Sequence, residues 1–149
     1  MQTGGNIAED VVVLATIDPD AYGTGDQTTD IIDMRYWREV LFIVMAGALG
    51  SSATIDFVVA GSASSDMSSS ATITGKSITQ LTEAGTDSDK QSIVRVTAEE
   101  VIAQGYRYIQ GTMTVGTATS DAGAVAVGWH ARYNPGNQFD LSTVAEIIQ

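Results

Sequence analysis

One stretch of the sequence decides the fold class: Arg38-Glu39-Val40-Leu41-Phe42-Ile43-Val44-Met45-Ala46. Its β-branched and aromatic residues predict a strand, and its continuous apolar character is typical of a central strand covered on both faces. A glycine-bearing turn follows at residues 47–52. Residues 53–60 then alternate between apolar and polar side chains, which predicts a second strand returning from that turn as a hairpin.

Further strands are predicted on both sides of this hairpin. Val11–Ile17 is a β-branched run that should end at the turn Asp18-Pro19-Asp20, and Thr28–Met34 should form the next strand. After the hairpin, we expect weaker strands at 71–74 and 77–82, a strand at 91–97, and a final pair at 106–115 and 124–133.

A single short helix is expected at Ala98–Ala103. Thr97 can act as its N-cap, Glu100 three residues later completes a capping box, and Gly105 should end it. About eight strands with turn signals roughly every 8–12 residues and one short helix predict an all-β fold. The expected architecture is an antiparallel β-sandwich, jelly-roll-like. Strand spacing does not separate a jelly roll from an immunoglobulin-like sandwich.

The 149 residues fit one domain with an extension at each end. We assign residues 1–10 to an N-terminal arm, 11–133 to the β-sandwich and 134–149 to a C-terminal tail. The apolar end of the tail needs a cover, which is either the chain's own sandwich or a neighbouring subunit. The residues we expect at interfaces, from the arm, the aromatic set and the tail, are Ile7, Trp37, Trp129, Phe139, Leu141, Val144, Ile147 and Ile148.

The charge of the chain argues against two classes of partner. Eighteen acidic residues oppose seven basic ones, which gives a net charge of −11. Proteins that grip DNA commonly place about 6–10 Lys or Arg on phosphates, and the bases here are scattered along the chain. An anionic membrane surface would repel the chain for the same reason. We therefore expect no nucleic-acid and no membrane partner.

No motif predicts catalysis. The sequence has no cysteine, and no Gly-x-Ser-x-Gly turn supplies a nucleophile for its one histidine, His130, so we expect a structural histidine near a strand end. Gly75-Lys76-Ser77 lacks the glycine that a phosphate-binding loop carries five positions earlier. We expect neither an enzyme nor a cofactor.

A calcium loop is the one metal site that the sequence suggests. Beginning at Asp18, acids occupy loop positions one and three and glycine occupies position six, but Tyr22 and Thr29 stand where the fifth and twelfth ligands belong. A solvated turn is therefore our expectation, with Asp18, Asp20 and Asp26 as the alternative metal ligands.

Two segments are similar to small structural proteins encoded beside the capsid genes of tailed bacteriophages. The first is the hairpin from Tyr36 through Gly47-Ala48-Leu49-Gly50 to Val59. The second is Val101-Ile102-Ala103-Gln104-Gly105-Tyr106-Arg107-Tyr108-Ile109, which resembles the short helix and Gly-Tyr-Arg-Tyr strand start of those proteins.

The resemblance implies a capsid decoration (cement) protein. Its implied partners are the major capsid protein and two further copies in a homotrimer, and its implied location is the outer capsid surface of the virion. An acidic chain suits the outside of a shell better than its DNA-lined inside. The alternatives are another virion component (a head fibre, neck or tail-surface protein) and a β-sandwich module that binds carbohydrate or calcium.

Overall fold

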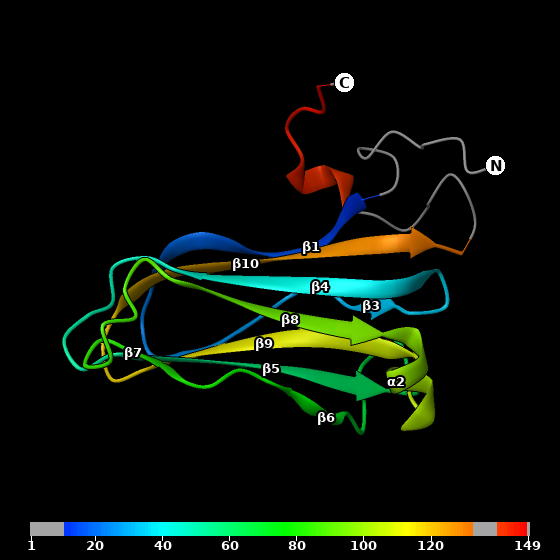
Figure 1. Cartoon of the computed structure of the whole chain (residues 1–149), viewed down its shortest axis with the longest axis horizontal. Coiled ribbons are helices and arrows are strands. Elements are labelled where there is room, and N and C mark those ends of the chain that lie inside the picture. The colour runs from blue at the N-terminus through cyan, green and yellow to red at the C-terminus, as the bar shows by residue number, and fades with distance from the viewer. Residues whose placement is uncertain (1–10, 133–139, 149) are drawn as a thin grey trace.

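The computed structural model describes residues 11–132 and 140–148, which form two antiparallel sheets, one short helix and a 3₁₀ turn (Figure 1). The predicted N-terminal arm lies outside the described residues. In chain order the elements are β1 (Val11–Tyr22), β2 (Gly25–Thr28), β3 (Ile32–Asp33), β4 (Trp37–Ala46), β5 (Thr54–Ser62), β6 (Ala71–Ser77), β7 (Leu81–Thr82), β8 (Gln91–Thr97), α2 (Ala98–Ala103), β9 (Tyr108–Gly116), β10 (Ser120–Ala131) and the 3₁₀ turn η1 (Leu141–Thr143). Among these described elements, no helix has the length and apolar character to cross a membrane.

The strand order identifies a jelly roll. One sheet has the order β1-β10-β4-β8, and the other has the order β2-β9-β5-β6, with β3 beside β9 and β7 beside β5. The antiparallel pairs β1·β10, β2·β9, β4·β8 and β5·β6 follow the chain as the two arms of one long hairpin. Wrapping that hairpin into two layers produces the two Greek keys of a jelly roll. The predicted all-β sandwich is confirmed. Strand spacing did not separate a jelly roll from an immunoglobulin-like sandwich, and the strand order identifies the jelly roll.

The sequence predicts two hairpins, one formed by β4 and β5 and one formed by β9 and β10, and both predictions are wrong. β4 and β5 lie in different sheets, and so do β9 and β10. The turn at 47–52 is a corner between the sheets, and its Gly50 lies so close to the carbonyl oxygen of Thr119 that a side chain would clash there. A glycine-bearing turn serves a hairpin and a corner equally well, which is why spacing alone does not distinguish them.

The core is centred on two aromatic rings from opposite sheets. Phe42 on β4 and Phe57 on β5 are almost fully buried, and their ring centroids lie 5.6 Å apart. Gly111 on β9 makes room for them, since a Cβ at this position would lie 2.5 Å from Cζ of Phe57 and 3.1 Å from Cε1 of Phe42. The close approach of the two sheets at this point therefore requires glycine at position 111.

Trp37 belongs to this core and not to an interface, which corrects the prediction for that residue. It is 1% exposed. A Cβ added at Gly128 would lie 2.6 Å from Cε3 of Trp37 and 2.7 Å from Cδ1 of Leu14, so the indole packs directly against bare backbone. Its Nε1 has no hydrogen-bond partner among the described residues.

β1 does not end at Asp18-Pro19-Asp20, where the sequence predicts a turn. The strand continues to Tyr22, and its pairing with β10 shifts register between Ile17 and Asp20. Proline cannot donate to a ladder but is tolerated at a bulge or on an edge strand, and β1 is an edge strand. Pro19 thus lies at an irregularity of the β1·β10 pairing and does not end the strand.

The predicted strand Thr28–Met34 is divided into β2 and β3. At Thr29 the regular ladder gives way to a local network: its N–H donates to Gly111 O at 2.9 Å, and its Oγ1 accepts from Gly111 N–H at 3.0 Å. β3 then continues along the same neighbour, and Asp33 accepts two hydrogen bonds from Arg107, at 3.0 and 2.6 Å. Burial raises the pKa of Asp33, but the hydrogen bonds and charges of Arg107 and Arg35 outweigh it and hold that pKa below its usual value.

The predicted helix and its capping box are confirmed. Glu100 N–H donates to Thr97 Oγ1 at 3.3 Å, and Thr97 N–H donates to Glu100 Oε2 at 2.9 Å. Gly105 follows the helix with φ at +80°, a conformation that favours glycine.

Gly111→Ala should destabilise the fold, because its methyl group has to displace Phe57 or Phe42. We expect a loss of about 1–3 kcal/mol in the free energy of unfolding, measured by urea titration. Gly23→Ala is the control, since no atom lies within 4 Å of a Cβ there. Equal stability of the two variants would contradict the role assigned to Gly111.

Candidate interaction surface

The four-stranded sheet carries apolar side chains on its solvent side as well as on its buried side. Side chains alternate along a strand, so the buried residues of β4 alternate with Leu41 and Ile43, which point outward. The register places Val127 beside Leu41, and it places Val125 and Ile93 on either side of Ile43. We call the following residues the outer face: Val11, Val13, Leu41, Ile43, Met45, Ile93, Val125, Val127 and Trp129.

Three residues of the outer face are strongly exposed: Ile93 at 64%, Met45 at 40% and Trp129 at 38%. The expectation that β4 is covered on both faces is therefore wrong. A two-layer sandwich buries one face of each sheet, so a strand that is apolar on both faces leaves one of them in water. Contiguous apolar patches of this kind mark interaction sites more often than isolated apolar residues do.

Trp129 was predicted as an interface residue, but its neighbours on the outer face were not. The missed signal is the apolar character of both alternating sets of residues in β4 and in residues 124–129 of β10. Combined with a two-layer fold, that pattern requires an apolar outer surface. Sequence reasoning expected β4 to be covered on both faces because it did not assign the strands to sheets.

One end of the outer face is rich in basic residues. A hollow of about 460 Å³ there is lined by Arg38, Glu39, Arg95, Thr97, Ala98, Glu99, His130 and Arg132. Arg95 is already paired, with its Nε 2.9 Å from Glu39 Oε2, and this hydrogen bond lowers the pKa of Glu39. Trp129 Nε1–H donates to His130 Nε2 at 2.7 Å. His130 thus orients the indole at the strand end, as expected of a structural histidine.

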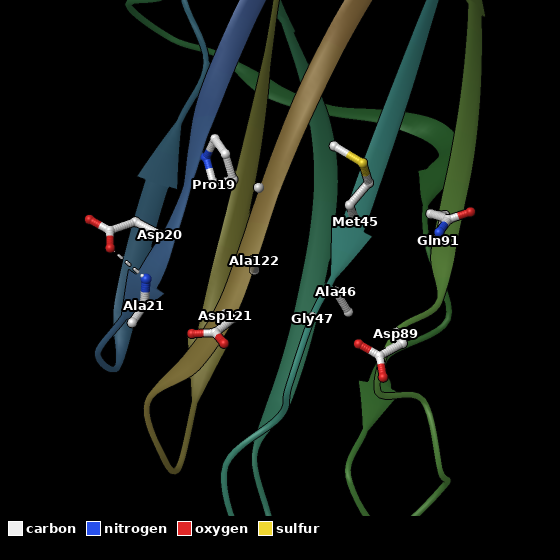
Figure 2. Close-up of a pocket in the computed structure, with 11 residues that line it drawn as sticks. Pro19, Asp20, Ala21, Met45, Ala46, Gly47, Asp89, Gln91, Asp121 and Ala122 are labelled. Carbon is white, nitrogen blue, oxygen red and sulfur yellow. Dashed lines mark hydrogen bonds between the residues drawn. The ribbon is translucent and has the colours of Figure 1, made fainter.

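The opposite end of the outer face is acidic. Its hollow, of about 630 Å³, lies between Pro19 and Met45, and Figure 2 shows these two side chains on opposite sides of it. Asp20, Asp89 and Asp121 lie at the strand ends around the same hollow. The nearby base Lys90 pairs with Asp87 at 3.0 Å.

The structure does not assemble the suggested calcium site. Asp18 and Asp20 lie on β1, whereas Asp26 lies on β2 in the other sheet and accepts from Thr114 Oγ1 at 2.6 Å. Within residues 11–132 and 140–148, no three acidic, histidine or cysteine side chains come together in a group that could hold a metal ion. Asp18 and Asp20 lie at the register shift of the edge strand β1.

The described part of the C-terminal tail, residues 140–148, contacts the edge of the four-stranded sheet. Asp140 N–H donates to Val13 O at 2.9 Å, and η1 follows. Beyond that anchor, Leu141 and Ile147 are each 53% exposed and Ile148 is 82% exposed, while Val144 is half-buried. These side chains are thus not packed into the chain's own core. The other two predicted interface residues, Ile7 and Phe139, lie outside the described residues.

Comparison with known proteins gives no sequence-level relative and a set of weak structural likenesses. No protein-family model and no curated protein matches the chain. The structure of the VP2 subviral particle of infectious bursal disease virus is similar at a TM-score of 0.48 and 11% identity; the match covers 87% of this chain and 34% of that one. The chain therefore spans about a third of the length of that protein.

Two smaller proteins match over most of their length. A chain from the structure of Broad Bean Stain Virus has a TM-score of 0.43 at 8% identity, with 94% of this chain and 100% of that chain covered. The xylan-binding module CBM15 has a TM-score of 0.36 at 9% identity, with 85% and 94% covered. Viral capsid proteins are thus among the structural neighbours. Likenesses this weak transfer no function to the chain.

Substitution by lysine at two adjacent positions of β8 should have very different effects on the free energy of unfolding. In the monomeric chain, at a protein concentration too low for association, Ile93→Lys should change the free energy of unfolding by no more than about 0.5 kcal/mol, because the side chain is 64% exposed there. Val94→Lys, at a position 7% exposed, should cost several times more or prevent folding, because it buries an ammonium group. Urea titration of both variants measures the difference. Equal destabilisation would show that the outer face is not a free surface of the chain.

Proposed function

We propose that the chain is a structural protein of a tailed-bacteriophage virion that binds the outer surface of the capsid and stabilises the lattice of the major capsid protein. The observation that carries the proposal is the C-terminal tail, which is anchored to the sandwich at Asp140 and presents Leu141, Ile147 and Ile148 to solvent. A folded sandwich with an exposed apolar tail suits attachment to another protein.

Attachment by an arm has a simple physical basis. An extended segment can add to an exposed sheet edge through main-chain hydrogen bonds, and its alternate side chains then enter pockets of the partner. Many copies displayed on a symmetric shell convert weak individual contacts into avid binding. The N-terminal arm around Ile7 is proposed as a second grip of the same kind.

The acidic composition supports a position on the outside of the capsid. A net charge of −11 repels packaged DNA and tolerates solvent. The resemblance of the two sequence segments to small head proteins of tailed phages supports the same location. The homotrimer that this resemblance implies remains a prediction.

Replacing both tail isoleucines, Ile147→Asp with Ile148→Asp, should abolish most capsid binding without changing the fold. Burial of one such side chain contributes about 1.5–3 kcal/mol, so losing two should weaken binding at least about tenfold. The measurement is cosedimentation with shells assembled from the major capsid protein of the same virus.

The matched control is Ile102→Asp on α2, a residue that is 61% exposed and distant in sequence from the tail. It should cosediment like the unmodified chain. The proposal fails if the unmodified chain does not cosediment, or if it saturates at one vertex per particle, as a neck or fibre protein would. Unchanged binding of the tail variant would exclude the tail as the attachment arm.

A further inference from the structure

The two ends of the outer face differ in shape as well as in charge. At the basic end, Trp129 on β10 is 38% exposed, and its indole N–H donates to His130 Nε2. At the acidic end of the same strand stands Gly123, whose neighbour on β4 is Met45. A Cβ at Gly123 would lie 3.0 Å from Cα of Pro19, so the bulge of β1 lies over one side of the glycine.

The hollow at the acidic end suits an aromatic side chain. Pro19 and Met45 lie on its two sides (Figure 2), and the small residues Ala122 and Gly123 also line it. Methionine sulfur and proline rings make favourable contacts with aromatic rings. The hollow is an open depression of the surface, with a volume of about 630 Å³, and not an enclosed cavity. One end of the outer face therefore carries an exposed ring, and the other end carries a space for one.

We propose that two copies of the chain pair face to face about a two-fold axis, so that Trp129 of each copy enters the hollow between Pro19 and Met45 of the other. Trp129 and Gly123 are six residues apart on one strand, which is about 20 Å. An axis that crosses β10 at Ala126, perpendicular to the strands, exchanges the two positions. A contact of this kind is isologous: each copy contributes the same patch.

The same rotation matches the rows between the two ends. On β10 it places Val125 of one copy over Val127 of the other, and on β4 it places Leu41 over Ile43, as the register of the two strands requires. Apolar residues thus meet apolar residues at the centre of β10 and β4, whereas on β8 the rotation places Ile93 of one copy over the side chain of Arg95 of the other. A desolvated central cluster with an aromatic anchor in a pocket is the arrangement in which interface energy concentrates.

Charge complementarity favours a second copy over another occupant. The rotation brings the end that holds Arg38 and Arg132, beside a single glutamate of that hollow, Glu99, that is unpaired among the described residues, over the acidic end that holds Asp20 and Asp121, on both sides of the axis. Arg95 and Lys90 are already paired within the chain. The net charge of −11 opposes association at long range, but at 0.15 M salt the Debye length is about 8 Å, so the close contacts decide.

The pairing predicts an even number of copies, whereas the resemblance implies three. Other strongly exposed large apolar residues in the described parts of the chain are Ile31, Ile102 and the tail residues. A cyclic trimer that covers the outer face would therefore have to use the tail of a neighbouring copy as the occupant. The number of copies in solution tests the pairing, and cosedimentation with shells tests capsid attachment, so the two proposals can fail separately.

Light scattering at 0.15 M salt gives the solution mass. The unmodified chain should have twice the mass of 15.6 kDa. Trp129→Ala removes the ring and Met45→Trp fills the hollow, and each variant should return to 15.6 kDa with an unchanged circular dichroism spectrum. Ile102→Ala is the control and should keep the doubled mass.

Charge reversal tests the orientation. Asp121→Arg and Arg132→Asp should each weaken pairing when present alone, and the chain with both changes should pair again, because its ends are complementary once more. A monomeric unmodified chain, or no recovery in the doubly reversed chain, would overturn the proposal. A trimer that dissociates when Ile147 and Ile148 are changed to Asp would identify the neighbour's tail as the occupant and overturn it as well.

Discussion

Two stacked sheets bury only the sides that face each other, and most features of this protein depend on that constraint. In the jelly roll, the inner sides meet where Phe42 of one sheet contacts Phe57 of the other over Gly111. Among the strands that supply this core, β4 and residues 124–129 of β10 are apolar on both sides. The side that does not face the core remains in water, and it presents a continuous apolar surface with oppositely charged ends.

The proposed capsid attachment and the proposed pairing of two copies use different parts of the chain. The tail is attached to the edge strand through Asp140 and carries its apolar side chains away from the core, which suits attachment to a different protein. The outer face combines an exposed ring, a matching hollow and opposite charges, which suits a second copy of the same chain. The two contacts use separate residues, so a virion component could be both paired with itself and fixed to a shell.

The positions of most strands and of the helix can be predicted from the sequence, because they depend on residues close together in the chain. The strands at 38–46 and 91–97 and the Thr97–Glu100 capping box depend on neighbouring residues, and they were predicted with small boundary errors. The sheet that each strand joins depends on contacts distant in sequence. For that reason β4 and β5 were taken as a hairpin although the turn between them is a corner.

The candidate surface shows the same limit. Trp37 and Trp129 are chemically alike, but one lies against the bare backbone of Gly128 and the other stands at the exposed end of β10. Their different environments come from the pairing of β4 with β10, which no local pattern specifies. Asp18, Asp20 and Asp26 fail as a metal site for a related reason: the chain passes from one sheet to the other between them.

The central claim is that the outer face is covered in the assembled protein. Peroxide oxidation of methionine tests it most directly, because Met45 lies in the proposed interface and Met67 lies in the loop between β5 and β6. As protein concentration rises, the oxidation rate of Met45 should fall while that of Met67 stays constant. An oxidation rate of Met45 that does not change with concentration would contradict the claim.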